Sequence, residues 1–87
     1  MRFLRRLYFC VRVNYLFDQA AKRAYGQQLD CESVTSQNLA MHDMLQGVYF
    51  MLLEEATHHT MKDPKGDEIY YYILDDFYDK AVKKYII

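Results

Sequence analysis

The sequence predicts an all-α protein, a small antiparallel bundle of three helices. Apolar residues recur at three- and four-residue intervals in three long segments, which is the helical period. The breaks between these segments fall at residues 26–32 and 60–67, and they contain Gly26, Pro64 and Gly66. No linker or low-complexity tract divides the 87 residues, so we expect a single helical domain over residues 1–87.

The first helix is predicted over residues 2–25 and has two apolar sides. Its core face is expected to consist of Phe9, Cys10, Val13, Phe17, Ala20 and Ala24. A second, apolar strip lies roughly 150° away around the helix axis and consists of Leu4, Tyr8, Val11 and Tyr15. The surface between the two sides carries Arg5, Arg12, Gln19 and Arg23.

The second helix is predicted over residues 34–60, with Ser33 or Ser36 as its N-cap. Its apolar stripe consists of Met41, Leu45, Val48, Leu52 and Ala56. Gly47 weakens the middle of this helix, which suggests a close helix crossing or a bend there. Three apolar residues fall outside the stripe and have no place in a three-helix core: Leu39, Phe50 and Leu53.

The third helix is predicted over residues 67–86, after a tight turn at residues 63–66, with Asp67 as N-cap and Glu68 in the first turn. Its apolar face consists of Tyr70, Ile73, Leu74, Phe77, Ala81 and Tyr85. Two ion pairs are expected on the opposite face, Asp76–Lys80 and Asp79–Lys83. The alternative fold class is α+β, with strands near residues 7–17 and 68–74, where β-branched and aromatic residues gather.

Charge is distributed unevenly along the chain, whose net charge is −1. Residues 1–25 carry six Arg or Lys against one acid, whereas residues 26–68 carry two Lys against eight acids. Cys10 and Cys31 form no disulfide framework, so we expect an intracellular, reducing compartment, although a single bridge between them stays open. Residues 1–17 are basic and free of acids, so an organellar targeting segment is the alternative.

Membrane insertion is not expected, because Arg12 and Asn14 interrupt the longest apolar stretch. The densest titratable cluster lies near the end of the second helix, where Glu55 and His58 have the Glu-x-x-His spacing of di-iron bundles. A dinuclear site needs further carboxylates that the other helices do not supply. We therefore expect no metal, no other cofactor and no enzymatic activity, and we interpret His58 and His59 as favourable partners of the helix dipole, with His59 on the core-facing side.

Weak nucleic-acid binding is one alternative function, because Arg5, Arg12 and Arg23 line one side of the first helix beside Tyr8 and Tyr15. The sequence pI of about 6.3 argues against it, since dedicated nucleic-acid domains are usually far more basic.

Protein binding is the function that the sequence favours. Fourteen side chains are aromatic, nine of them Tyr, and Tyr is typical of both cores and interfaces. The partner-binding residues are expected to be Leu4, Tyr8, Val11 and Tyr15, with Arg5 and Arg12 as steering charges and with Tyr71 and Tyr72 on the third helix. The partner would be another copy of the chain or a larger assembly in which this protein is an accessory subunit. A small viral or mobile-element inhibitor of a host protein is a further alternative.

Overall fold

A computed structural model describes residues 2–27, 34–62 and 69–86 of the chain. Three helices account for all of them except Ile86: α1 (Arg2–Gln27), α2 (Val34–Lys62) and α3 (Ile69–Tyr85). The prediction of an all-α three-helix bundle is therefore confirmed. The α+β alternative is wrong, because residues 7–17 and 69–74 are helical and the described ranges contain no strand. The helical period in these segments outweighs the preference of their Tyr, Val and Ile residues for sheets.

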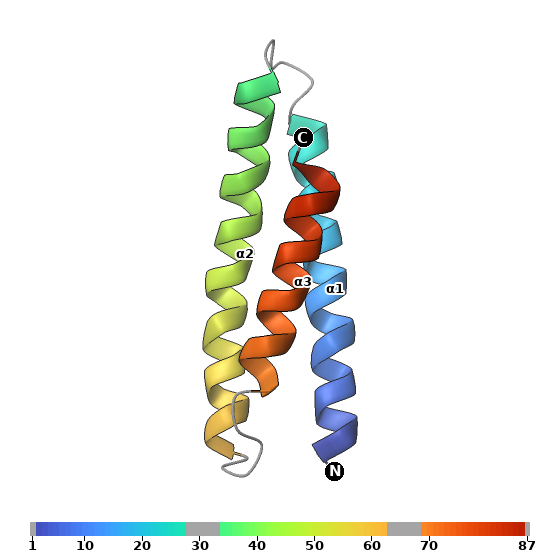
Figure 1. Cartoon of the computed structure of the whole chain (residues 1–87), viewed down its shortest axis with the longest axis vertical. Helices are drawn as coiled ribbons and strands as arrows, with labels where there is room; N and C mark the ends of the chain where they lie inside the picture. Colours follow the sequence, from blue (N-terminus) through green and yellow to red (C-terminus); the bar gives the residue numbers. More distant parts are fainter. Residues whose placement is uncertain (1, 28–33, 63–68, 87) are drawn as a thin grey trace.

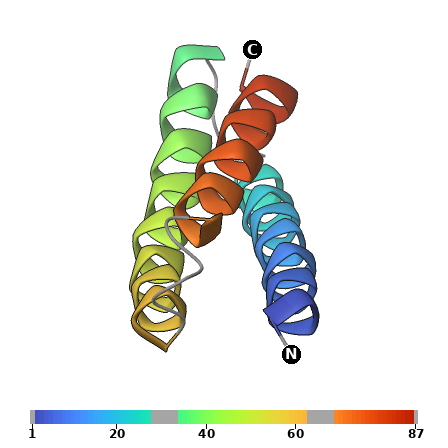
Figure 2. The ribbon, with the colours of Figure 1, turned by 60° about the horizontal axis from the view of Figure 1, so that its bottom comes forward.

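The helices run up, down and up, so neighbours in sequence are antiparallel (Figure 1). Every pair of helices is in contact, and α3 lies along the seam between α1 and α2 (Figures 1 and 2). The molecule is a rod of 48 × 18 × 16 Å, and the two ends of the chain lie toward opposite ends of it. At 1.5 Å per residue, α3 is about 26 Å long, whereas α1 and α2 reach about 39 and 44 Å. α1 and α2 are therefore longer than α3, and both extend beyond it at the lower end of the rod in Figure 1.

The core consists of one predicted face from each helix. Its buried members are Phe9, Val13, Phe17, Ala20, Ala21, Ala24, Met41, Leu45, Leu52, Ala56, Tyr70, Leu74 and Ala81. Val48, Ile73, Phe77 and Tyr85 were predicted to be buried but are only partly so, and they pack against the core from its edge. Cys10 is also only half-buried, whereas Ala21 is fully buried although the expected core face omitted it.

Tyr hydroxyls link the helices at the edges of this core. Tyr49 on α2 donates to Asp75 on α3 over 2.7 Å, and this hydrogen bond raises the pKa of Tyr49 to about 12. Tyr85 on α3 donates to Asp18 on α1, also over 2.7 Å. On the outer face of α3 the two predicted ion pairs are present, with N–O distances of 2.9 Å for both Asp76–Lys80 and Asp79–Lys83.

Three helix ends differ from the prediction by one or two residues. α1 continues through Gly26 to Gln27, α2 continues to Lys62, and α3 ends at Tyr85. Ser36 is not an N-cap, because α2 already begins at Val34 and Ser36 lies inside it. Ser33, Asp67, Glu68 and the predicted turn at residues 63–66 lie outside the described residues.

Gly47 does not mark a close helix crossing, contrary to the prediction. It is exposed on α2, and a Cβ atom added there would meet no other atom within 4 Å. The backbone of α2 is helical on both sides of it. Gly47 therefore costs α2 stability without serving the packing of this chain.

Replacing Gly47 by Ala is expected to raise the free energy of unfolding by about 1 kcal/mol, because Ala restricts the unfolded backbone and favours the helix. Urea or thermal unfolding followed by circular dichroism measures the change. Gly26→Ala is the matched control: Gly26 also has free space around it but lies in the last turn of α1, so its effect should be smaller. A destabilised Gly47→Ala variant would contradict the free space seen there.

Candidate protein-interaction surface

The apolar strip of α1 is exposed along its whole length. Leu4 is 57% exposed, Tyr8 and Val11 are 62% exposed, and Tyr15 is 60% exposed. Phe3 and Leu7, on the neighbouring side of the same helix, are 75% and 50% exposed. The strip predicted from the sequence is therefore an open surface of the folded chain.

Two features of the fold leave this surface open. The strip lies on the side of α1 opposite Phe9 and Val13, which fill the core against α2 and α3. In addition, Tyr70 in the first turn of α3 is level with Phe9, since their ring centroids are 5.4 Å apart. The turns of α1 before Phe9 therefore lie beyond the start of α3, as Figure 1 shows at the lower end of the rod.

A groove between α1 and α2 continues the strip. It has a volume of about 340 Å³ and is lined by Tyr15, Leu16, Gln19, Ala20 and Arg23 of α1 and by Met44, Val48 and Met51 of α2. Tyr15 belongs to both the strip and the groove. We call this the outer groove, because α3 contacts a different side of α2. At 100° per residue, Met44 and Met51 lie about 140–160° around the helix from Tyr49, which binds Asp75 of α3.

An ion pair connects α1 to α2 at the junction of the strip and the outer groove. Arg12 donates from Nε to Glu55 Oε1 over 2.7 Å and from a terminal nitrogen to Oε2 over 3.1 Å. About a third of each side chain is exposed. The bond to Glu55 raises the pKa of Arg12, with a smaller contribution from Tyr8. Arg12 is therefore partly exposed on this surface, and it also links α1 to α2 through its bonds to Glu55.

The predicted binding residues on α3 do not join this surface. Tyr71 is partly buried, and its hydroxyl lies 2.9 Å from that of Thr57 on α2. Tyr72 is 68% exposed but belongs to α3, whereas α1 and α2 form the outer groove. Both were predicted as partner-binding residues on the third helix, and their helix is not part of the strip or the outer groove.

The Glu55 and His58 pair is not arranged as a metal site. Glu55 binds Arg12 through both oxygens, and His58 is exposed. Within residues 2–27, 34–62 and 69–86, no three His, Cys, Asp or Glu side chains are close enough to hold one ion. Cys10 is a free thiol whose pKa is raised by burial, and Cys31 lies outside the described residues.

His59 faces the core as the helical period predicts. Its ring stacks on Tyr70 at a centroid distance of 4.8 Å and meets the edge of Phe9 at 5.4 Å. Its Nδ1 is buried and has no hydrogen-bond partner among the described residues. Burial lowers the pKa of His59, and the nearby charge of Arg5 lowers it further, while Glu55 acts in the opposite direction.

Acidification below about pH 6.5 is therefore expected to destabilise the fold through His59. A histidine with a lowered pKa in the folded state favours folding while it is neutral, so this contribution is present above the pKa of the unfolded chain and is lost as pH falls. An NMR titration should place the midpoint of His59 below 6.5. Unfolding at pH 7.5 and pH 5 should show a smaller loss of stability for His59→Gln than for the natural chain; an equal loss would assign the effect to other groups.

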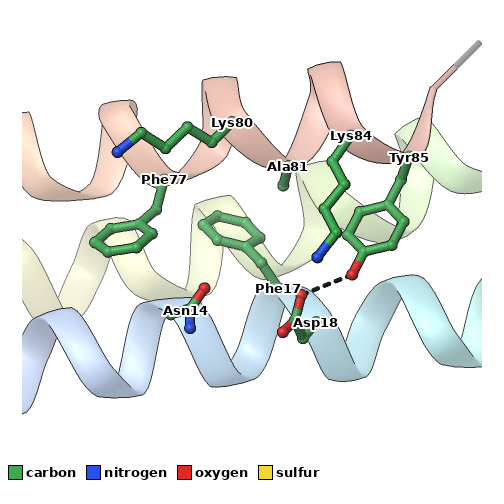
Figure 3. Close-up of a pocket in the computed structure, with 8 residues that line it drawn as sticks. All are labelled: Asn14, Phe17, Asp18, Phe77, Lys80, Ala81, Lys84 and Tyr85. Atoms are coloured by element: carbon green, nitrogen blue, oxygen red, sulfur yellow. Dashed lines mark hydrogen bonds between the residues drawn. The ribbon is translucent and has the colours of Figure 1, made fainter.

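A second hollow, between α1 and α3, differs from the outer groove in size and chemistry. It measures about 90 Å³, and Figure 3 shows its lining: Asn14, Phe17, Asp18, Phe77, Lys80, Ala81, Lys84 and Tyr85. Three of its polar side chains interact with one another, since Tyr85 donates to Asp18 and the Lys84 ammonium lies 5.1 Å from the Tyr85 ring centroid. This hollow is smaller than the outer groove. Its Asp18, Lys84 and Tyr85 side chains already contact one another.

The fold defines the structural class of the protein, which is a three-helix bundle. α3 packs against one side of the α1–α2 pair, and the outer groove on the other side is open. The chain matches no protein-family model, and no curated protein or solved structure resembles it at a significant level. No part of the described helices is long and apolar enough to cross a membrane.

The outer groove is the feature that sequence reasoning missed. Met44, Val48 and Met51 follow one another at four- and three-residue intervals on α2, which is a detectable helical pattern. Only the pairing of α1 with α2 places them opposite Leu16 and Ala20.

Proposed function

We propose that this protein is a non-enzymatic protein–protein interaction module, a small accessory component of a larger complex, that binds its partner through the apolar strip and the outer groove. The observation that carries the proposal is the exposure of all four strip residues, at 57–62%, on a chain whose core is already filled from the other side of α1. Contiguous exposed apolar patches of this kind are typical of interaction sites rather than of inert surfaces.

The composition of the surface supports the proposal. Tyr8 and Tyr15 offer large apolar rings with a hydroxyl for hydrogen bonding, which is why Tyr is enriched where interfaces concentrate their binding energy. Met44 and Met51 in the outer groove are flexible and polarizable, so they adapt to the shape of a partner. The Arg12–Glu55 pair fixes the spacing of the two helices beneath the binding partner.

Site-specific photo-crosslinking tests the proposal. A p-benzoylphenylalanine placed at Tyr8 of the full chain, in extract of the cells that make it, should give a protein adduct of one defined mass. Val11→Glu should abolish that adduct, because it puts a charge in the centre of the strip. The same crosslinker at Tyr72, an equally exposed Tyr on α3, is the control and should not give the adduct.

The adduct partner is then purified and titrated with the untreated chain. A one-to-one complex that Val11→Glu weakens and Tyr72→Glu leaves intact is the expected result. The same crosslinks from Tyr8 and Tyr72, or none from either, would contradict binding through the strip.

A further inference from the structure

We infer that the occupant of this surface is an amphipathic α-helix of another protein, with an apolar seam flanked by carboxylates, lying along the strip and in the outer groove. This inference rests on the proposed function and specifies the chemistry of the partner. Three observations carry it: the spacing of the strip, the shape of the groove and the charge of α1.

The spacing of the strip matches a helical partner. Leu4, Tyr8, Val11 and Tyr15 follow one another at intervals of four, three and four residues, which is the seam spacing of a coiled coil. All four are exposed, so no described helix covers this seam. An apolar face with residues at the same intervals would interdigitate with them along about 17 Å of α1.

The shape of the groove also suits a helix. Two antiparallel helices with an apolar trough of about 340 Å³ between them offer the ridges and grooves into which a further helix packs. On α2, Gly47 lies three residues after Met44 and four before Met51, and is therefore on the same side as both. Gly47 is exposed with free space above it, so a partner backbone could approach closely at this point. This gives the glycine, which weakens α2 in the isolated chain, a role in docking.

Charge selects the partner and argues against a second copy. Between Phe3 and Phe17, α1 carries no acidic residue. At 100° per residue, Arg5 and Arg12 lie beside the strip, and Arg12 is paired with Glu55. Strip-to-strip pairing of two chains would bring these like charges together, and like charges facing across an interface oppose association. Arg23 lines the far part of the groove and adds to the positive edge. Carboxylates on the edge of the incoming helix that faces α1 are complementary to this charge.

Two designed peptides of about 21 residues serve as probes. Both carry Leu at alternating intervals of three and four, and they differ only in the flanking positions, which are Glu in one and Lys in the other. Each is titrated into the full chain labelled with ¹⁵N, and binding is followed by NMR and by fluorescence anisotropy. The Glu peptide should bind at one-to-one stoichiometry and at least about tenfold more tightly than the Lys peptide at about 0.05 M salt. The difference should shrink at about 0.5 M salt, where exposed charges are screened.

Variants of the chain locate the docked peptide. Tyr15→Glu should weaken the Glu peptide at least about tenfold, while Tyr72→Glu should leave it unchanged. Both residues are exposed Tyr on helices, so neither change should unfold the chain, and circular dichroism checks this. The largest amide shifts should fall at Val11, Tyr15, Met44 and Met51.

Three results would overturn the inference. Equal affinity for both peptides would show that charge does not select the partner. Binding of neither peptide would show that the surface does not take an amphipathic helix. A chain that sediments as a dimer and becomes a single chain with Val11→Glu would assign the surface to a second copy. The two peptide results leave the proposed function standing, whereas a dimer would contradict an accessory role in a larger complex. Crosslinking that does not distinguish Tyr8 from Tyr72 would contradict binding through the strip itself.

Discussion

Phe9→Ala is expected to lower the free energy of unfolding by about 3–5 kcal/mol, the cost of removing a large aromatic side chain from a core. Phe9 is fully buried, and its ring makes T-shaped contacts with both His59 and Tyr70 at centroid distances of 5.4 Å. The cavity would lie where all three helices meet, so none of them can close it alone. Domains of this size are stable by only about 5–15 kcal/mol, and the variant should therefore be close to unfolding at room temperature.

Phe3→Ala is the matched control for this change. Phe3 belongs to the same helix but is 75% exposed, so its removal should alter stability by no more than about 0.5 kcal/mol. Urea titrations followed by circular dichroism measure both variants. Equal destabilisation by the two would mean that α1 presents a different face to the core.

Ala21→Leu is expected to cost about 1–3 kcal/mol by overpacking. Ala21 is fully buried in the half of α1 where Ala20 and Ala24 are also buried, so this part of the helix approaches its neighbours on small side chains. Leu and Ala both favour helices, so the change isolates packing from helix propensity. For a chain of 87 residues, each kcal/mol corresponds to about 4–8 °C in Tm.

Lys22→Leu tests whether a larger apolar residue anywhere on this part of α1 would lower the stability, whether or not it is buried. Lys22 is the next residue along α1 and is exposed, so Leu there meets solvent instead of the core. Thermal unfolding should show Lys22→Leu near the natural Tm and Ala21→Leu well below it. A Tm for Ala21→Leu equal to or above that of the natural chain would show unfilled space beside this residue.

Much of the core could be predicted from the sequence because burial in a helix repeats with the helical period. Phe9, Met41 and Leu74 were each assigned to the correct face on that basis alone. The apolar strip was found in the same way, as residues that share a direction around the axis of α1. Leu39 and Phe50, which had no place in the predicted core, are 61% and 57% exposed, whereas Leu53, assigned with them, is partly buried against the core.

Other features depended on contacts between residues far apart in the sequence. The pairing of Arg12 with Glu55 joins positions 43 residues apart, whereas the sequence analysis treated Arg12 as a steering charge and Glu55 as a neighbour of His58. Tyr71 appeared equivalent to Tyr72, but the hydroxyl of Tyr71 lies against that of Thr57 on α2. Gly47 looked like a crossing point because a glycine signals reduced bulk but does not indicate what lies beside it.

The sequence by itself determined that the chain forms three helices and which sides of each are apolar. Only the tertiary structure decided which apolar side of α1 is covered and that α1 and α2 enclose an open groove. The physical reason is that the helical period fixes the direction of a side chain about its own axis. Whether that direction meets another helix depends on how all three pack, and the core lies on the opposite side of α1, where Phe9, Val13 and Phe17 are buried.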